Sequence, residues 1–308
     1  MKIFSSIPNF PSETRTIITI GTFDGVHLGH SVILNRVNSL AKKTKIQSLL
    51  LTFFPHPRHV LQIADQDMRL INTLDEKKML LEKSGLDNLV IHEFTKEFSR
   101  VQSANFVRDY LVDKLNLHTL VIGHDHHFGR NREGSIKELT VLSDLYGFNI
   151  EMISPQLFDK VTVSSTKIRN LLENGYIEKA NHYLGYEFFL FGKVIRGNAI
   201  GKTIGFPTAN ITIQNRWKLC PADGVYAVKV ILEERVFKGM MNIGNKPTFE
   251  CGKKTLEVHL IDFSEDIYGK ELQIKFIKKI REEKKFKNLD ALKQQLLIDR
   301  NKVKYLVY

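Results

Sequence analysis

The chain has little cysteine and no long apolar run, and these shortages exclude several classes of protein. The 308 residues hold two cysteines, Cys220 and Cys251, too few for a disulfide scaffold or for a metal cluster built of cysteine alone. The longest apolar runs, such as 48–54, are of strand length and far below the ~20 residues of a membrane-spanning helix. Residues 1–15 lack the apolar core of a signal peptide. We therefore expect a cytoplasmic protein with free thiols.

Acidic residues are also in the minority. The chain has 45 Lys and Arg against 34 Asp and Glu, a net charge of +11. This surplus favours an acidic partner, which could be nucleic acid, a membrane surface or a phosphorylated small molecule. The content of 43% hydrophobic and 26% charged residues is ordinary for globular protein and excludes a collagen-like fibre or a disordered tail. Composition does not choose among the partners.

The order of the expected elements predicts two domains, the usual number for a chain of this length, since domains run to ~100–200 residues. In the first half, short apolar runs such as 16–21 alternate with helical stretches such as 30–41, which is typical of a parallel sheet covered by helices. The second half is rich in strands separated by turn residues, which indicates an antiparallel barrel or sandwich, and 289–300 is helical. We predict domains 1–184 and 185–308.

Helix ends are predicted at two further places. A helix over 75–85 would have Asp75 at its N-cap and Gly85 past its end. Ser135 and Glu138 have the spacing of a capping box.

A glycine-rich loop, GTFDGVHLGH, occupies 21–30 between a strand and a helix, where backbone N–H groups and the helix dipole hold phosphate. His27 and His30 are three residues apart, so both imidazoles can face one anion and stabilise charge on an α-phosphate during nucleotidyl transfer. Isolated histidines at this spacing are more often incidental, and no third zinc ligand is evident, but the setting favours function. The predicted phosphate-binding residues of the loop are Gly21, Phe23, Asp24, Gly25 and Gly29.

Two later segments are predicted at the same edge of the sheet. GHDHHFGRNREG (123–134) follows a strand, and ligands of open α/β sheets bind at the carboxyl ends of strands. SSTKIR (164–169) starts a helix, so its hydroxyls can cap that helix, bind phosphate or do both. Arg169 can reach the same anion. The predicted phosphate-binding residues here are Ser164, Ser165 and Thr166.

The segment GKVIRGNAIGKTIGFPTANI (192–211) is the most specific in the chain. Thr208 and Asn210 are two apart on a strand, so their side chains face one side, and hydroxyl and amide oxygens suit Mg²⁺ held with nucleotide phosphates. A glycine-rich hairpin entering an ordinary strand is an equally open interpretation of this segment alone. The predicted phosphate-binding residues of the loop are Gly197, Gly201, Lys202 and Gly205.

An alternating strand at 256–263 carries Glu257, a candidate general base for a substrate alcohol. On this segment alone, a carboxylate that only faces solvent is the simpler interpretation.

Taken together, these strings resemble one known family. GTFDGVHLGH, FFPHP, GHDHHFG and SSTKIR are similar to the flavin adenylyltransferase domain over about 15–183. GKVIRGNAIGKTIGFPTANI, GVYAV, MNIGNKPTF, LEVHLIDF and IREEKKF are similar to riboflavin kinase from about residue 185 onward. Nearly the whole chain therefore resembles the bacterial bifunctional riboflavin kinase/FAD synthetase family.

The resemblance implies a Rossmann-like α/β nucleotidyltransferase domain with a parallel sheet, followed by a six-stranded all-β kinase barrel and a C-terminal helix. It implies ATP-dependent phosphorylation of riboflavin to FMN, then adenylylation of FMN by ATP to FAD with release of pyrophosphate. Mg²⁺ is the expected cofactor, and riboflavin, FMN, FAD and ATP are the expected partners. We expect no nucleic acid or membrane partner, and a monomer or weak homo-oligomer.

The resemblance also assigns roles. Glu257 would be the kinase base, while His27, His30 and Arg169 would stabilise charge in the adenylyl transfer. His126 stands where the family usually has Phe, and imidazole offers less apolar surface to a flavin ring. The flavin-binding residues implied are Asp125, His126 and Phe128 in the first domain and Arg281 and Phe286 in the second.

Two other hypotheses stay open. A different nucleotidyltransferase fused to an unrelated barrel would share the HxGH string, but the PTAN and LEVHL strings argue against it. A nucleic-acid-binding module would explain the net charge and the basic stretch 275–287. The interspersed Glu282 and Glu283 favour an ordinary solvated strand and turn there.

Overall fold

A computed structural model describes residues 1–62, 68–123, 136–153, 163–197, 201, 204–245 and 254–307. The chain forms two compact units. The sheet unit consists of Met1–Met68 and Asn72–Ser164, and the barrel unit of Arg69–Ile71 and Ser165–Tyr308. The predicted division of the two activities between residues 184 and 185 stays a prediction, since compactness does not test where an activity begins.

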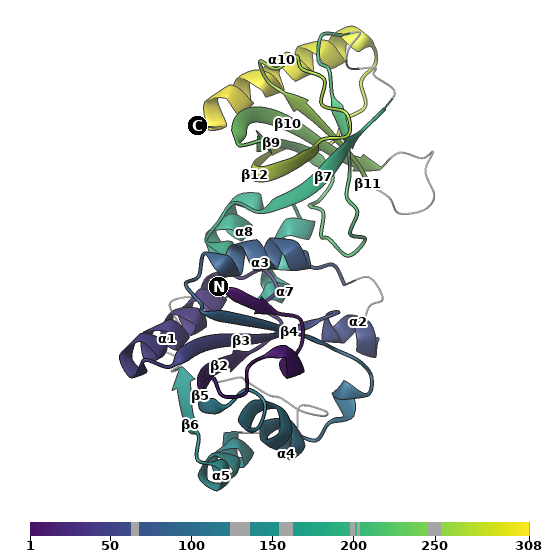
Figure 1. The fold of residues 1–308 in the computed structure, drawn as a ribbon. Coiled ribbons are helices and arrows are strands. Elements are labelled where there is room, and N and C mark those ends of the chain that lie inside the picture. Colours follow the sequence, from purple (N-terminus) through teal and green to yellow (C-terminus); the bar gives the residue numbers. More distant parts are fainter. Residues whose placement is uncertain are drawn as a thin grey trace. The chain divides into compact units, whose positions relative to one another are not determined.

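The sheet unit is built on six parallel strands in the order β1-β4-β3-β2-β5-β6 (Figure 1), which confirms the predicted parallel sheet. The chain builds the sheet outward from β2 in both directions, so the order reverses between β2 and β5. Such a reversal is where open α/β sheets bind ligands, at the carboxyl ends of the strands. The strands are Lys2–Phe4 (β1), Thr16–Ile20 (β2), Gln47–Phe54 (β3), Asn88–Glu93 (β4), Leu117–Gly123 (β5) and Asn149–Ile153 (β6).

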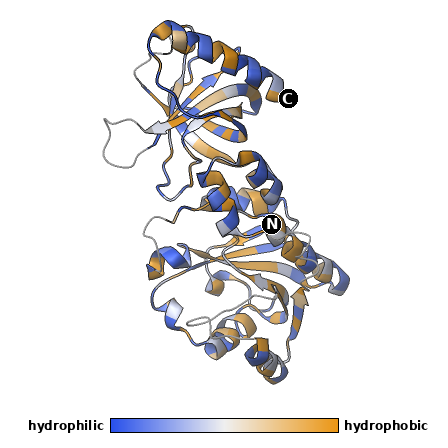
Figure 2. Cartoon of the chain, turned by 180° about the vertical axis from the view of Figure 1, so that it is seen from behind, coloured by the Kyte–Doolittle hydropathy of each residue, from blue (hydrophilic) through white to orange (hydrophobic). Residues whose placement is uncertain are grey.

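Helices cover both faces of this sheet. Neighbouring residues of one strand point to opposite faces, and Ile17 and Ile18 accordingly belong to two different apolar clusters. Leu34 and Leu81, from two helices, pack in the cluster of Ile17, and Phe106 packs in the other. Figure 2 shows the sheet mainly in hydrophobic colours between helices of mixed character. The helices are Ile7–Asn9 (η1), Leu28–Thr44 (α1), Pro57–Leu61 (α2), Leu74–Glu82 (α3), Phe98–Arg100 (η2), Ser103–Asn105 (α4), Phe106–Val112 (η3) and Ile136–Tyr146 (α5).

The predicted start of the α3 helix was wrong. Thr73, not Asp75, is the N-cap: its hydroxyl accepts from the backbone N–H of Glu76 at 3.2 Å, and Glu76 Oε2 accepts from the N–H of Thr73 at 2.9 Å. This reciprocal capping box satisfies two backbone donors, more than Asp75 alone could. Gly85 does lie beyond the helix end, at φ +79°. The second predicted capping box lies partly outside the described residues, because Ser135 is not among them.

The barrel unit is a closed six-stranded barrel, in the order β10-β11-β8-β7-β12-β9, with every neighbouring pair antiparallel. It confirms the predicted barrel and final helix, and excludes the sandwich. The strands are Phe189–Ile195 (β7), Ala209–Thr212 (β8), Gly224–Leu232 (β9), Arg235–Asn245 (β10), Lys254–Leu260 (β11) and Glu271–Arg281 (β12). The helices are Ser165–Glu173 (α7), Ile177–Leu184 (α8) and Leu289–Leu306 (α10).

The α10 helix fixes which barrel side chains face outward. It lies against the strands (Figure 1), and its Val303 packs in one buried cluster with Ala227 of β9 and Met240 of β10. Those two residues oppose each other in the register, so they mark the outer face of the barrel. Asn242 is two residues from Met240 and therefore shares this outer face.

A short segment from the first half of the sequence also belongs to the barrel unit. Leu70 bridges to Lys218, and the backbone N–H of Leu219 donates to Leu70 O at 2.8 Å. The Lys218 ammonium is buried, donates to Ile71 O and Phe189 O at 2.7 Å each, and lies 4.6 Å from the ring centroid of Phe188. These contacts tie residues 69–71 to the barrel.

Within the described residues, no helix is both long enough and apolar enough to cross a membrane. Cys220 is of intermediate exposure, whereas Cys251 lies outside the described residues.

Candidate active sites

The loop after β2 turns sharply at the switch point of the sheet. Its first residue, Gly21, donates its backbone N–H to Leu51 O at 3.1 Å and so stays aligned with β3. Phe23, Gly25 and Val26 then adopt positive φ angles of 47°, 89° and 35°. Residues other than glycine rarely adopt a positive φ, and strained residues of this kind are frequent at ligand sites. The turns bury Asp24 at the start of α1.

The structure brings the two predicted histidines into direct contact. His27 caps α1, since its Nδ1 accepts from the backbone N–H of His30 at 3.3 Å. The two imidazoles stack at a centroid distance of 3.7 Å, and Phe23 stacks on His30 at 4.5 Å. A Cβ on Gly29 would lie 3.2 Å from the His27 ring and 3.3 Å from Val163, so glycine leaves room for the His27 ring.

His30 is held in its neutral form. Burial lowers its pKa well below the ordinary 6.5, and the charges of His27 and Lys77 lower it further. Its Nδ1 is buried and has no hydrogen-bond partner within the described part of the chain. A neutral imidazole carries one N–H, so His30 has one ring nitrogen to donate and one to accept.

Lys77, which the sequence reasoning missed, supports the loop from α3. Its buried ammonium donates to Thr22 O at 2.6 Å. Burial lowers the pKa of Lys77, and the charge of Asp24 opposes that shift. Asp24 also accepts from the backbone N–H of Asn72 at 3.3 Å. The arrangement places a cation directly beneath the glycine-rich loop.

The other residues predicted for the adenylyltransferase site are divided between the two units or lie outside the described residues. Ser164 ends the sheet unit, whereas Ser165, Thr166 and Arg169 begin α7 in the barrel unit. Arg169 is buried and Thr166 is exposed. That these residues bind the same phosphate as the histidines stays a prediction. The flavin-binding residues predicted for this site, namely Asp125, His126 and Phe128, lie outside the described residues.

In the barrel unit, three polar residues form one row across adjacent strands. Glu257 of β11 opposes Asn210 of β8 on one side and Asn242 of β10 on the other. Adjacent strands are about 4.7–4.9 Å apart, and directly opposed side chains share one face. Glu257 therefore lies between two amides on the outer face of the barrel. Asn242 was not predicted, although it lies in the MNIGNKPTF string.

Two predicted glycines come very close to the PTAN residues. A Cβ on Gly197 would overlap the amide group of Asn210. A Cβ on Gly201 would overlap the carbonyl of Phe206 and lie 3.4 Å from Thr208 Oγ1. Glycine is therefore required at both positions for the backbone to approach. Gly205 turns the chain with φ +81°, whereas the predicted Lys202 lies outside the described residues.

A cavity of about 430 Å³ opens beside Thr208. Apolar residues form most of its walls, with a few carboxylates and hydroxyls among them, which is the usual character of a small-molecule site. Its lining residues are Val194, Pro207, Thr208, Ala209, Val258, Leu260, Phe263, Ser264, Glu265, Asp266, Ile267 and Tyr268.

The two residues predicted to border a flavin in the barrel lie together at the far end of the row. Arg281 of β12 opposes Val225, which in turn opposes Asn242. The guanidinium carbon of Arg281 lies 5.8 Å from the ring centroid of Phe286. Its Nε donates to the buried carboxylate of Asp299 at 2.8 Å, which fixes Arg281 against α10.

Comparison with known proteins gives a family for each half of the chain. The FAD synthetase family matches residues 10–167, and the riboflavin kinase family matches residues 184–307.

Several curated relatives match nearly end to end. A bifunctional riboflavin kinase/FMN adenylyltransferase of Haemophilus influenzae is 39% identical over 91% of this chain and 90% of its own. Those of Escherichia coli K12 (36%; 97% and 96%) and Bacillus subtilis (35%; 94% and 91%) are similar in extent. A solved structure described as a macrolide-efflux protein of Streptococcus pneumoniae shares the fold, with a TM-score of 0.89, 28% identity and 98% of both chains covered.

Proposed function

The chain belongs to the family of bifunctional riboflavin kinases/FMN adenylyltransferases, and from that premise we propose which residues perform each of its two activities. The kinase phosphorylates riboflavin with ATP to give FMN, and the adenylyltransferase joins FMN to AMP from a second ATP to give FAD. The riboflavin kinase activity belongs to the barrel and the FMN adenylyltransferase activity to the parallel sheet.

The opposition of Asn210 and Glu257 across β8 and β11 carries the kinase assignment. The hydroxyl of Thr208 and the amide oxygen of Asn210 are the hard oxygen ligands that Mg²⁺ takes together with ATP phosphates. Gly197 and Gly201 bring the loop backbone against Asn210 and Phe206, which is the close backbone approach that phosphate binding needs, so the residues present fit a metal–nucleotide group. Mg²⁺ supplies neutralisation of phosphate charge. The cavity beside Thr208 is our candidate for the base of ATP.

In this arrangement Glu257 accepts the proton of the riboflavin 5′-hydroxyl. A bond forms between that oxygen and the γ-phosphorus of ATP, the bond from this phosphorus to the bridging oxygen breaks, and ADP leaves. Phosphoryl transfer depends mainly on holding the attacking and leaving oxygens in line. A base next to Asn210 meets that requirement, because the acceptor hydroxyl then lies beside the bound phosphates.

The adenylyl transfer needs a different set of groups. A phosphate oxygen of FMN attacks the α-phosphorus of ATP, and pyrophosphate leaves. That oxygen is already anionic, so charge stabilisation rather than a strong base is required. We assign this stabilisation to His27, to the neutral His30 and to the backbone N–H groups at the start of α1, with Lys77 beneath them. By the family resemblance, we also assign phosphate binding to Ser164, Ser165, Thr166 and Arg169.

A coupled assay tests these assignments. Riboflavin, ATP and Mg²⁺ should give FMN first and FAD later, separated by liquid chromatography. Asn210→Ala should abolish FMN formation while the conversion of added FMN to FAD persists, and His30→Ala should do the reverse. Loss of both activities in either folded variant would contradict the assignment of two separate sites. The cytoplasmic location and the oligomeric state stay predictions.

A further inference from the structure

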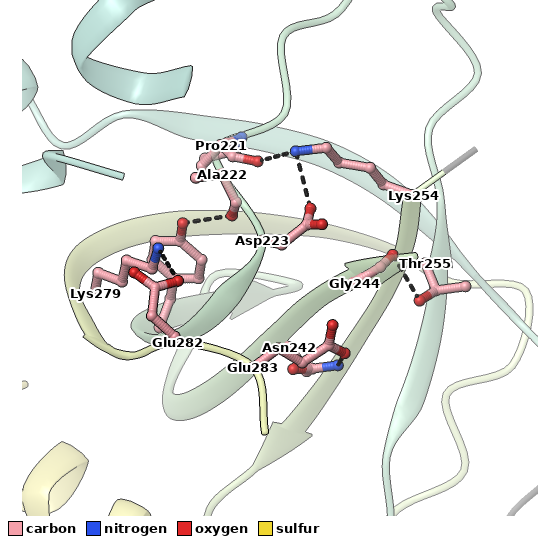
Figure 3. Close-up of polar contacts among 11 residues, drawn as sticks. Pro221, Ala222, Asp223, Asn242, Gly244, Lys254, Thr255, Lys279, Glu282 and Glu283 are labelled. Carbon is pink, nitrogen blue, oxygen red and sulfur yellow. Dashed lines mark hydrogen bonds and ion pairs between the residues drawn. The ribbon is translucent and has the colours of Figure 1, made fainter. Parts of the chain in front are cut away.

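Two polar residues beside Glu257 have no role in the scheme above. Asn242 opposes Glu257 on the side away from Asn210. Glu283 follows the end of β12, and its Oε1 accepts from Asn242 Nδ2 at 3.4 Å (Figure 3). Within the described residues, no lysine or arginine forms an ion pair with Glu283. The next residue along the chain differs, because Glu282 pairs with Lys279 at 2.7 Å.

The backbone of β10 is shaped to admit Glu283. A Cβ on Gly244 would overlap Glu283 Oε1, and it would lie 2.8 Å and 2.9 Å from the carboxyl carbon and Oε2. The glycine does not serve a special backbone angle, since Gly244 is not among the described residues with positive φ. Its missing side chain is therefore the space in which the carboxylate lies.

The row of Asn210, Glu257 and Asn242 has two chemically different ends. The backbone at Gly197 and Gly201 lies close to Asn210 and Thr208, so the phosphates of ATP belong at the Asn210 end of the row. In-line transfer then puts the acceptor hydroxyl at Glu257 and the remainder of the acceptor on the other side. On that side lie first Asn242 and Glu283, and beyond Val225 the Arg281 and Phe286 pair.

We propose that Asn242 and Glu283 bind the secondary hydroxyls of the ribityl chain and make the kinase selective for a polyhydroxylated acceptor. The inference rests on the proposed kinase function and deepens it. In riboflavin, the hydroxyl that reacts is followed by three further hydroxyls before the ring system. A hydroxyl donates well to a carboxylate and accepts from an amide N–H, and Glu283 and Asn242 supply one group of each kind.

The test compares two acceptors in the full-length protein. Riboflavin is one, and the other is a flavin with a 5-hydroxypentyl side chain, which keeps the reacting hydroxyl and lacks the others. For the unaltered protein we expect kcat/KM to favour riboflavin at least about 100-fold, because a site built to bind hydroxyls rejects analogues without them. In Glu283→Gln, kcat/KM for riboflavin should fall roughly 10–100-fold, as for the loss of a charged hydrogen bond. In the same variant, kcat/KM for the hydroxypentyl flavin should change less than about twofold, the usual effect of a surface substitution that does not contact the substrate.

Two further variants make the outcome specific. Glu282→Gln alters the neighbouring carboxylate and should leave the preference unchanged. Gly244→Ala fills the space that Glu283 occupies and should reduce the preference as Glu283→Gln does. Conversion of FMN to FAD by the same preparations shows that each variant is folded.

The outcomes separate the two proposals. Equal losses for both acceptors in Glu283→Gln would show that Glu283 only holds its segment on β10, and the inference would be wrong. An unchanged preference would overturn it as well. Failure of the unaltered protein to phosphorylate riboflavin would instead overturn the proposed kinase function itself.

Discussion

Glu257 and Asn210 lie directly opposite each other on β11 and β8, although 47 positions separate them in the sequence. The pairing puts a carboxylate beside an amide group on the outer face of a closed barrel. In the proposed kinase site the two must be neighbours, because Glu257 would activate the hydroxyl that attacks a phosphate held with Mg²⁺ at Asn210. The register of two strands provides this proximity.

Replacement of Glu257 by Gln keeps the shape of the side chain and removes its basicity. We expect the rate of FMN formation to fall by about 10²–10⁴-fold, the range for loss of a general base. The conversion of FMN to FAD should continue at its original rate in the same preparation. A rate of FMN formation within a few-fold of the original would mean that Glu257 is only a solvent-facing carboxylate.

Replacement of Gly197 by Ala tests the close approach of the loop to Asn210. The added methyl group would overlap the Asn210 amide, so either the loop or the amide must move. A displacement of about 1 Å can cost about 10²-fold in rate, and we expect a loss of that order in kcat/KM for ATP during FMN formation. Steady-state kinetics with varied ATP measures it. Unchanged kinetics would show that the loop does not border the nucleotide.

The low pKa of His30 predicts a pH dependence of stability. Because the unfolded chain binds a proton near pH 6.5 and the folded chain resists it, the free energy of unfolding should decrease as pH falls below 6.5. His30→Gln should show a shallower decrease in thermal midpoints between about pH 7.5 and 5, where histidine ordinarily titrates. Some decrease should remain, since burial also lowers the pKa values of His92, His118 and His259. Parallel curves for the two proteins would contradict the neutral state of His30.

Lys77 offers a matched pair of variants with Lys78. Lys77→Met removes the cation that donates to Thr22 O in the glycine-rich loop. We expect kcat/KM for FAD formation to fall roughly 10–100-fold, equivalent to the ~1.5–3 kcal/mol of a charged hydrogen bond. Lys78 is paired with Asp75 at 3.1 Å on the helix surface, so Lys78→Met should have almost no effect. Similar effects of the two substitutions would mean that the loop does not depend on Lys77.

Short-range patterns predicted most of the elements, because strand and helix periodicity depends on neighbours in the chain. The expectation that Thr208 and Asn210 face one side was likewise within reach of local patterns, since alternation along one strand predicts it, and the structure begins β8 at Ala209, one residue after Thr208. The opposition of Glu257 to Asn210 was not, because it depends on β8 and β11 being neighbours in the barrel. Closure of the barrel fixes that strand order, and no local pattern encodes it.

Lys77 was missed for a related reason. Lysine is rarely buried, so a pair of lysines in a predicted helix gives no reason to expect a buried cation. The available signal was its spacing: Lys77 lies three residues after Leu74 and four before Leu81, on the side of α3 that faces the core. Asn242 gave no such signal, because a single amide on a buried strand is common.

The pairing of residues 69–71 with the barrel has a consequence for dividing the protein. Lys218 lies within the predicted kinase segment 185–308, yet one of its hydrogen-bond acceptors, Ile71 O, lies more than a hundred positions earlier in the chain. An excised kinase fragment would keep a buried ammonium that has lost a partner, together with the exposed backbone edge at which Leu70 is bound. A gene split between the two activities would thus yield halves that are not independent, and their reunion in one polypeptide supplies part of the stability of the kinase.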